Sequence, residues 1–102
     1  MLYVEGSPRL QAAVERIGWS FDWTEKLVDS QTVSSATLTV TRLEDDADVT
    51  AATAIGGVVV ASPYTTVTIG HLVARKRYRV DVLATLSGGS LQVASLELRV
   101  PY

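Results

Sequence analysis

Most of the chain alternates between apolar and polar positions with a period of two, which is the pattern of half-buried β-strands. The alternation begins in residues 17–24, whose odd positions are apolar and whose even positions are glycine or polar. It recurs over residues 34–41, where Ala36, Leu38 and Val40 are apolar and alternate with threonines. Shorter β-branched runs predict three further strands, at residues 49–53, 58–61 and 65–69.

The last third of the chain predicts a β-hairpin. Two alternating stretches, residues 77–86 and 93–100, flank a Ser-Gly-Gly-Ser sequence. A two-residue Gly-Gly turn would place the two apolar sets on opposite faces of the sheet, which is costly. A three-residue turn or a bulge keeps them on one face. Of the two registers that remain, the one that sets Arg79 opposite Glu97 is preferred to the one that sets Arg79 opposite Arg99, because like charges directly opposite are unfavourable.

About seven short strands with frequent turn signals predict an all-β fold, an immunoglobulin- or fibronectin-type β-sandwich of antiparallel strands over residues 17–102. Tyr78 follows Leu72 by six residues at the start of the penultimate strand. Such sandwiches place there a tyrosine whose hydroxyl ties the preceding corner to the strand. The 102-residue chain has no cysteine, so its core must rest on packing alone. Its 29 valine, threonine and isoleucine residues suit a pleated sheet.

Residues 1–16 fall outside this pattern and form a separate N-terminal segment. Leu10, Val14 and Ile17 have the spacing of one helix face, and the Ser-Pro pair before them is a suitable helix start. A helix this short is marginal without packing support. An extended arm and a short helix therefore both remain open.

Charge and targeting signals narrow the class of protein. Nine basic and eleven acidic side chains give a formal charge of −2. A nucleic-acid module usually carries a basic surplus, so we expect no nucleic-acid partner. The first residues lack the features of a signal peptide, and no stretch approaches the roughly 20 apolar residues of a membrane helix. We therefore expect a protein made in the cytoplasm, with no membrane partner.

The residues that could carry chemistry do not form a recognisable catalytic set. His71 is the single histidine and would have to serve as the base of any triad, yet no serine lies in a nucleophile-elbow motif. We expect a loop histidine, no enzyme activity and no cofactor. Glu44, Asp45, Asp46 and Asp48 form an acidic cluster that lacks the spacing of a calcium loop. A solvated turn is the preferred interpretation, and no metal site is expected.

Two groups of residues are candidates for contact with a partner. Trp19, Phe21 and Trp23 are three large rings within five residues, of which one or two should fill the core and another could anchor an interface. The basic cluster of residues 75–77, with Arg79, marks the outer face of a strand. It is either a solvated, edge-protecting face or a contact for an acidic protein. The candidate interface residues are Trp19, Trp23, Arg75, Arg77 and Arg79.

Short motifs in the chain resemble a family of small bacteriophage tail proteins, the fiber–tail adaptors. The opening of that family is matched by Phe21-Asp22-Trp23, Leu27 and Val33-Ser34-Ser35. Its later part is matched by Tyr78-Arg79-Val80, Gly88-Gly89 and Leu98-Arg99-Val100. The resemblance covers about residues 17–101, although residues 44–62 depart from the pattern.

The resemblance implies a non-enzymatic virion component. Such adaptors are small immunoglobulin-like domains that form homo-oligomeric rings on a phage tail and join the tail or connector to fibres or other peripheral proteins. It also implies that residues 1–16 contact a neighbour, with Leu2, Tyr3 and Leu10 as contact residues, and that an exposed sheet edge suits strand addition. Two alternatives are a capsid decoration (cement) protein of the same fold and a host-encoded adhesion or carbohydrate-binding domain. The absent signal peptide counts against the last.

Overall fold

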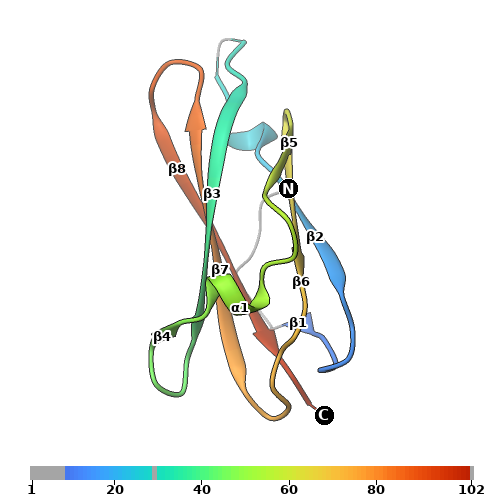
Figure 1. The fold of residues 1–102 in the computed structure, drawn as a ribbon. Helices are drawn as coiled ribbons and strands as arrows, with labels where there is room; N and C mark the ends of the chain where they lie inside the picture. Colours follow the sequence, from blue (N-terminus) through green and yellow to red (C-terminus); the bar gives the residue numbers. More distant parts are fainter. Residues whose placement is uncertain (1–8, 29, 102) are drawn as a thin grey trace.

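Two β-sheets, packed against each other with the core between them, make up the protein in the computed structural model (Figure 1). The structure describes residues 9–28 and 30–101. The five-stranded sheet has the order β1-β8-β7-β3-β4, and its strands are β1 (Arg9–Leu10), β8 (Leu91–Arg99), β7 (Arg77–Leu86), β3 (Val33–Arg42) and β4 (Ala47–Asp48). The three-stranded sheet has the order β2-β6-β5, and its strands are β2 (Ile17–Asp22), β6 (Tyr64–Ile69) and β5 (Val59–Ala61). Two single helical turns complete the described part, η1 (Thr24–Lys26) and α1 (Thr50–Thr53). The predicted all-β sandwich is confirmed.

The β7–β8 hairpin has the register that charge and parity predict. Tyr78 lies opposite Leu98, and Arg79 lies opposite Glu97. A three-residue turn joins the strands: the Leu86 N–H donates to the Ser90 carbonyl at 2.8 Å, and the Gly89 N–H donates to the Leu86 carbonyl at 2.8 Å. Gly89 has a φ of 91°, which only glycine adopts readily. The turn therefore sets which side chains of both strands face the core.

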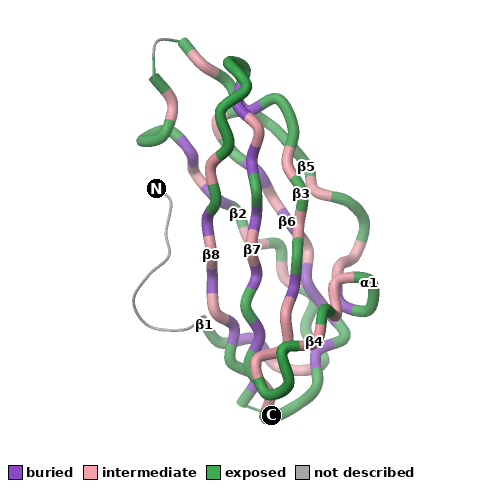
Figure 2. The backbone as a smooth tube through the Cα atoms, turned by 90° about the vertical axis from the view of Figure 1, so that its left-hand side faces the viewer, coloured by how far each residue is buried: buried purple, intermediate pink, exposed green. Residues whose placement is uncertain are grey.

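The core lies between the sheets and contains residues from both. Figure 2 looks onto the five-stranded sheet, where buried positions alternate with intermediate or exposed ones along β8 and β7. The fully buried indole of Trp23 donates its Nε1–H to the Thr65 hydroxyl at 2.9 Å, so its polar atom is satisfied inside the sandwich. The largest buried apolar side chains are Phe21, Trp23, Ile69, Leu72, Tyr78, Leu86, Leu96 and Leu98.

Tyr78 forms the predicted corner. Its ring is buried, and its hydroxyl accepts a hydrogen bond of 2.9 Å from the Val73 N–H in the β6–β7 loop. The loop is thereby held against the start of β7, where several of the predicted surface residues lie.

The predicted strand at residues 49–53 is wrong. The chain forms the two-residue strand β4 and then the helical turn α1. The Asp48 carboxylate accepts hydrogen bonds from the Thr50 N–H at 3.0 Å and from the Thr50 hydroxyl at 2.7 Å. This local bonding offers the backbone an alternative to a sheet ladder, and it outweighs the β propensity of the segment.

The described part of the N-terminal segment is not helical. Arg9–Leu10 is a strand that pairs in parallel with the end of β8, and a loop whose residues 14–16 are exposed continues to β2. Leu10 itself is exposed. Residues 1–8, which include the expected contact residues Leu2 and Tyr3, lie outside the described residues.

Gln11 explains why the helix does not form. The Gln11 side chain is fully buried, and its Nε2 donates to the Ile69 carbonyl at 2.7 Å and to the Glu15 carbonyl at 3.1 Å. Its Oε1 accepts a hydrogen bond of 2.9 Å from the Trp19 indole. These bonds hold the segment on β2 and β6, and a marginal helix of two or three turns cannot compete with them.

The tyrosine corner predicts a specific loss of stability. Tyr78→Phe removes the acceptor of the Val73 N–H while keeping the buried ring, so the free energy of unfolding should fall by about 1–2 kcal/mol. Urea unfolding followed by tryptophan fluorescence measures it. Tyr64→Phe is the matched control because Tyr64 is 49% exposed, and its change should stay within about 0.5 kcal/mol. Equal losses in the two variants would contradict the role of the corner.

Candidate protein-interaction surface

The outer face of the five-stranded sheet has two chemically different ends. The register directs alternate residues of β3, β7 and β8 away from the core. The outward residues of β3 are serine and threonine, whereas those of β7 and β8 differ between the two ends. Near the β7–β8 turn they include Leu83, Leu91 and Val93, and near the other end they are Arg77, Arg79, Glu97 and Arg99. Each end is a candidate site.

The apolar end consists of Leu83, Leu91 and Val93, which are 37%, 59% and 56% exposed. Leu83 lies directly opposite Val93, and Leu91 is two residues from Val93 on the same face of β8. The three side chains therefore form one patch rather than scattered positions. Adjacent exposed apolar side chains on a small domain mark a site of interaction more often than isolated ones do.

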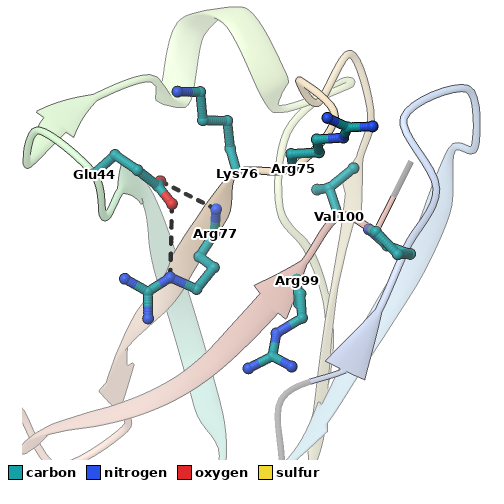
Figure 3. A pocket seen from close by; sticks show the side chains of 7 residues that line it. Glu44, Arg75, Lys76, Arg77, Arg99 and Val100 are labelled. Atoms are coloured by element: carbon teal, nitrogen blue, oxygen red, sulfur yellow. Dashed lines mark hydrogen bonds and ion pairs between the residues drawn. The ribbon is translucent and has the colours of Figure 1, made fainter.

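The charged end contains an open hollow of about 310 Å³, here called the basic hollow. Four cationic side chains and one carboxylate line it together with Val100 and Pro101; the charged residues are Glu44, Arg75, Lys76, Arg77 and Arg99. In the view of Figure 3, Arg77 and Arg99 extend to one side of the hollow, and Lys76 and Arg75 extend to the other.

Two like charges face each other at the hollow, because Arg77 begins β7 directly opposite Arg99 at the end of β8. Glu44 compensates one of them. Its carboxylate accepts a hydrogen bond of 3.1 Å from the Arg77 N–H and lies 3.6 Å from the Arg77 Nε. The backbone hydrogen bond from Arg77 lowers the pKa of Glu44 below its ordinary value. Glu44 is therefore ionised at neutral pH and is committed to Arg77.

Backbone hydrogen bonds fix the loop that carries the other cations. The Arg75 N–H donates to the Val100 carbonyl at 2.7 Å, and the Val100 N–H donates to the Lys76 carbonyl at 3.0 Å. Arg75 has a φ of 67°, in the left-handed region that non-glycine residues rarely occupy. The structure thus holds a strained arginine in place beside the end of β8.

The predicted basic cluster is divided by the fold. Arg75 and Arg77 line the hollow, whereas Arg79 forms an ion pair with Asp81, whose Oδ2 lies 2.9 Å from the Arg79 Nε. Arg79 also lies opposite Glu97 in the register. Arg79 is therefore electrically balanced and belongs to the middle of the face, outside the hollow.

The acidic cluster is a turn in which three of the four carboxylates, those of Glu44, Asp45 and Asp48, are engaged within the chain. Asp45 makes a two-pronged contact with Arg42, with Nε–Oδ1 and Nη2–Oδ2 distances of 3.0 and 2.8 Å. Asp48 is bonded to Thr50, and Glu44 to Arg77. Among residues 9–28 and 30–101, no group of three or more histidine, cysteine or acidic side chains is placed to hold a metal ion.

The aromatic candidates lie mostly in the core. Trp23 is 0% exposed, so its expected role at an interface is corrected: the indole packs between the sheets and has no surface to offer a partner. Phe21 is buried as well. Trp19 is half-buried against the core, with its indole bonded to Gln11. An interface role for its remaining exposed edge stays a prediction.

His71 occupies the β6–β7 loop, where it is exposed and has a φ of 55°. Its place in a loop is as predicted.

None of the helical turns in the described part of the chain is long and apolar enough to cross a membrane.

Reasoning from the sequence missed the partners that complete the two ends of the face. Arg99 joins the hollow only through the register, since the pairing that sets Arg79 opposite Glu97 also sets Arg77 opposite Arg99. The preferred register alone therefore predicts that Arg77 lies opposite Arg99. For the apolar end, the signal was leucine and valine at positions that the alternation directs outward, such as Leu83 and Val93.

No protein-family model matches the chain, and no curated protein sequence matches it. The resemblance to fiber–tail adaptors stays a prediction from short motifs, and the fold and the outer face of the five-stranded sheet carry the functional argument.

The acidic turn predicts a measurable titration. The hydrogen bonds from Arg42 lower the pKa of Asp45 from 3.8 to about 2. The stabilisation from this pair should be present in full above pH 3.8 and should disappear as the pH falls through about 2. The reason is that, on acidification, the Asp45 carboxyl is protonated in the unfolded chain before it is protonated in the folded chain. In Arg42→Gln, the pKa of Asp45 measured by NMR of its carboxyl carbon should return toward 3.8.

Asp48 is the internal control for this titration. Its pKa is lowered mainly by the hydrogen bond from the Thr50 hydroxyl, so Arg42→Gln should leave it unchanged. An Asp45 pKa that stays near 2 in the variant would refute the assigned cause.

Proposed function

We propose that this chain is a non-enzymatic structural protein that assembles with other protein subunits through the outer face of its five-stranded sheet. The observation that carries the proposal is the apolar end, where Leu83, Leu91 and Val93 form one exposed patch on regular strands. Sites built on strands are held rigidly, so the backbone of the patch is already ordered before a partner binds.

The edge of β8 supports the same proposal. β1 pairs only with Leu98 and Arg99, so within the described residues the rest of β8 has no strand on its outer side. Unpaired N–H and C=O groups along an edge are a template for an added strand. Leu91 and Val93 lie on this segment, so an open edge and the apolar patch occur on the same strand.

The motif resemblance gives the proposal its specific form: a fiber–tail adaptor of a bacteriophage virion, arranged as a homo-oligomeric ring that joins the tail or connector to fibres or peripheral tail proteins. An immunoglobulin-type sandwich belongs to this proposal. The Tyr78 corner supports that type.

The carbohydrate-binding alternative is less well supported. Stacking on sugars needs exposed rings on a sheet face. Phe21, Trp23 and Tyr78 are buried and Trp19 is half-buried, which leaves Tyr64 as the one well-exposed ring on a described strand. A capsid decoration protein could use the same apolar face, so the position of the chain in an assembled particle, determined by electron cryomicroscopy, separates it from a tail adaptor.

The proposal predicts that Val93→Glu weakens assembly. The glutamate places a charge in the apolar patch, so self-association measured by sedimentation equilibrium should weaken at least tenfold, and incorporation into particles should be lost. Val59→Glu is the matched control, because Val59 is 62% exposed on the other sheet. It should retain assembly, and both variants should keep the wild-type circular dichroism.

A wild-type chain that stays monomeric at high concentration and is absent from particles would overturn the proposed function. Equal loss of assembly in Val93→Glu and Val59→Glu would refute the assignment of the apolar end as the contact.

A further inference from the structure

We propose that the basic hollow is a docking site for an acidic, carboxylate-rich segment of a protein partner. This inference rests on the proposed function, because it gives the chemical class of one of the protein partners that such a structural protein would contact.

The charge balance of the hollow favours a negatively charged ligand. Glu44 is the single carboxylate among the lining residues, and it is bonded to Arg77. Within the described part of the chain, Arg75, Lys76 and Arg99 have no ion pair. The same two strands show a balanced arrangement two residues further along, where Arg79 has Asp81 beside it and Glu97 opposite. Along β7 and β8, the uncompensated positive charge therefore lies at the hollow.

The arrangement of charges and backbone at the hollow is unfavourable for the isolated chain. Arg77 and Arg99 lie directly opposite each other, and like charges at such positions repel. Arg75 holds a φ of 67°, which favours glycine. Strain that the surrounding structure maintains occurs often at ligand-binding sites. A carboxylate bound between the cations would convert the repulsion into charge-assisted hydrogen bonds.

The shape of the hollow indicates the class of ligand. An open volume of about 310 Å³ accommodates one or two side chains of a peptide rather than an enclosed small molecule. Pro101 is exposed beside the cations and provides apolar surface that suits the methylene groups of glutamate. A nucleic acid is disfavoured, because no aromatic residue lines the hollow and the chain carries a net charge of −2.

Fluorescence anisotropy of a fluorescein-labelled hexaglutamate amide, titrated with the full chain at low ionic strength, tests the proposal. The peptide should bind, and its affinity should fall as salt is added. Arg99→Gln should weaken binding by roughly two- to fivefold, as expected for one exposed ion pair.

Arg75→Gly distinguishes binding from a structural role. Glycine adopts the positive φ without strain, so the melting temperature should be unchanged or higher, while peptide binding weakens as it does in Arg99→Gln. A variant that lost binding merely because it was damaged would instead have a lower melting temperature.

Arg79→Gln is the matched control, because it removes the same charge from the same face but from a residue paired with Asp81. It should change the affinity by less than twofold, and labelled hexalysine should not bind. The proposal is overturned if hexaglutamate does not bind, if Arg79→Gln weakens binding as much as Arg99→Gln, or if labelled oligothymidylate binds more tightly than hexaglutamate. None of these outcomes depends on assembly. Absence of peptide binding would therefore overturn the docking site but not the proposed function, and a chain that does not assemble could still be tested for peptide binding.

Discussion

The register of the β7–β8 hairpin is the constraint on which the rest of the structure depends. Because side chains alternate faces, a slip of one residue would move the inward set of one strand to the solvent side. The three-residue turn, closed by Gly89 at a φ of 91°, prevents the slip. It places Tyr78 and Leu98 together in the core and, on the other face, creates both the Leu83–Val93 pair and the opposed arginines of the basic hollow. The fold and the candidate surface thus have one cause.

Hydrogen bonds at the polar atoms of buried aromatic side chains, one donated by Trp23 and one accepted by Tyr78, fix the sandwich in the absence of disulfides. The indole of Trp23, which directly follows β2, is hydrogen-bonded to Thr65 of β6. The Tyr78 hydroxyl holds the β6–β7 loop. Gln11 connects the N-terminal segment to Trp19 and to β6. A buried network whose members are all satisfied specifies one arrangement, whereas apolar packing alone permits several. Within the described residues, no buried side-chain nitrogen or oxygen lacks a partner.

The sequence predicted best those elements whose faces differ in polarity. Strands β3, β7 and β8 follow from alternation, and their register follows from parity and charge. The segment that contains α1 was predicted as a strand because its composition is β-prone, and only the local bonding between Asp48 and Thr50 decides otherwise. The burial of Gln11 could not be predicted, since its three side-chain hydrogen bonds join groups that come together only in the folded chain. Trp23 stood on the inward side of the alternation, so its burial was already indicated.

The central claim is that the outer face of the five-stranded sheet is the surface by which this protein contacts others. Hydroxyl-radical footprinting, compared between the isolated chain and particles that contain it, tests this claim most directly. The account predicts strong protection of Leu83 and Leu91 in the particle, while Val59 and Tyr64 on the other sheet remain as reactive as in the isolated chain. Unchanged reactivity of Leu83 and Leu91, with protection confined to Val59 and Tyr64, would contradict it.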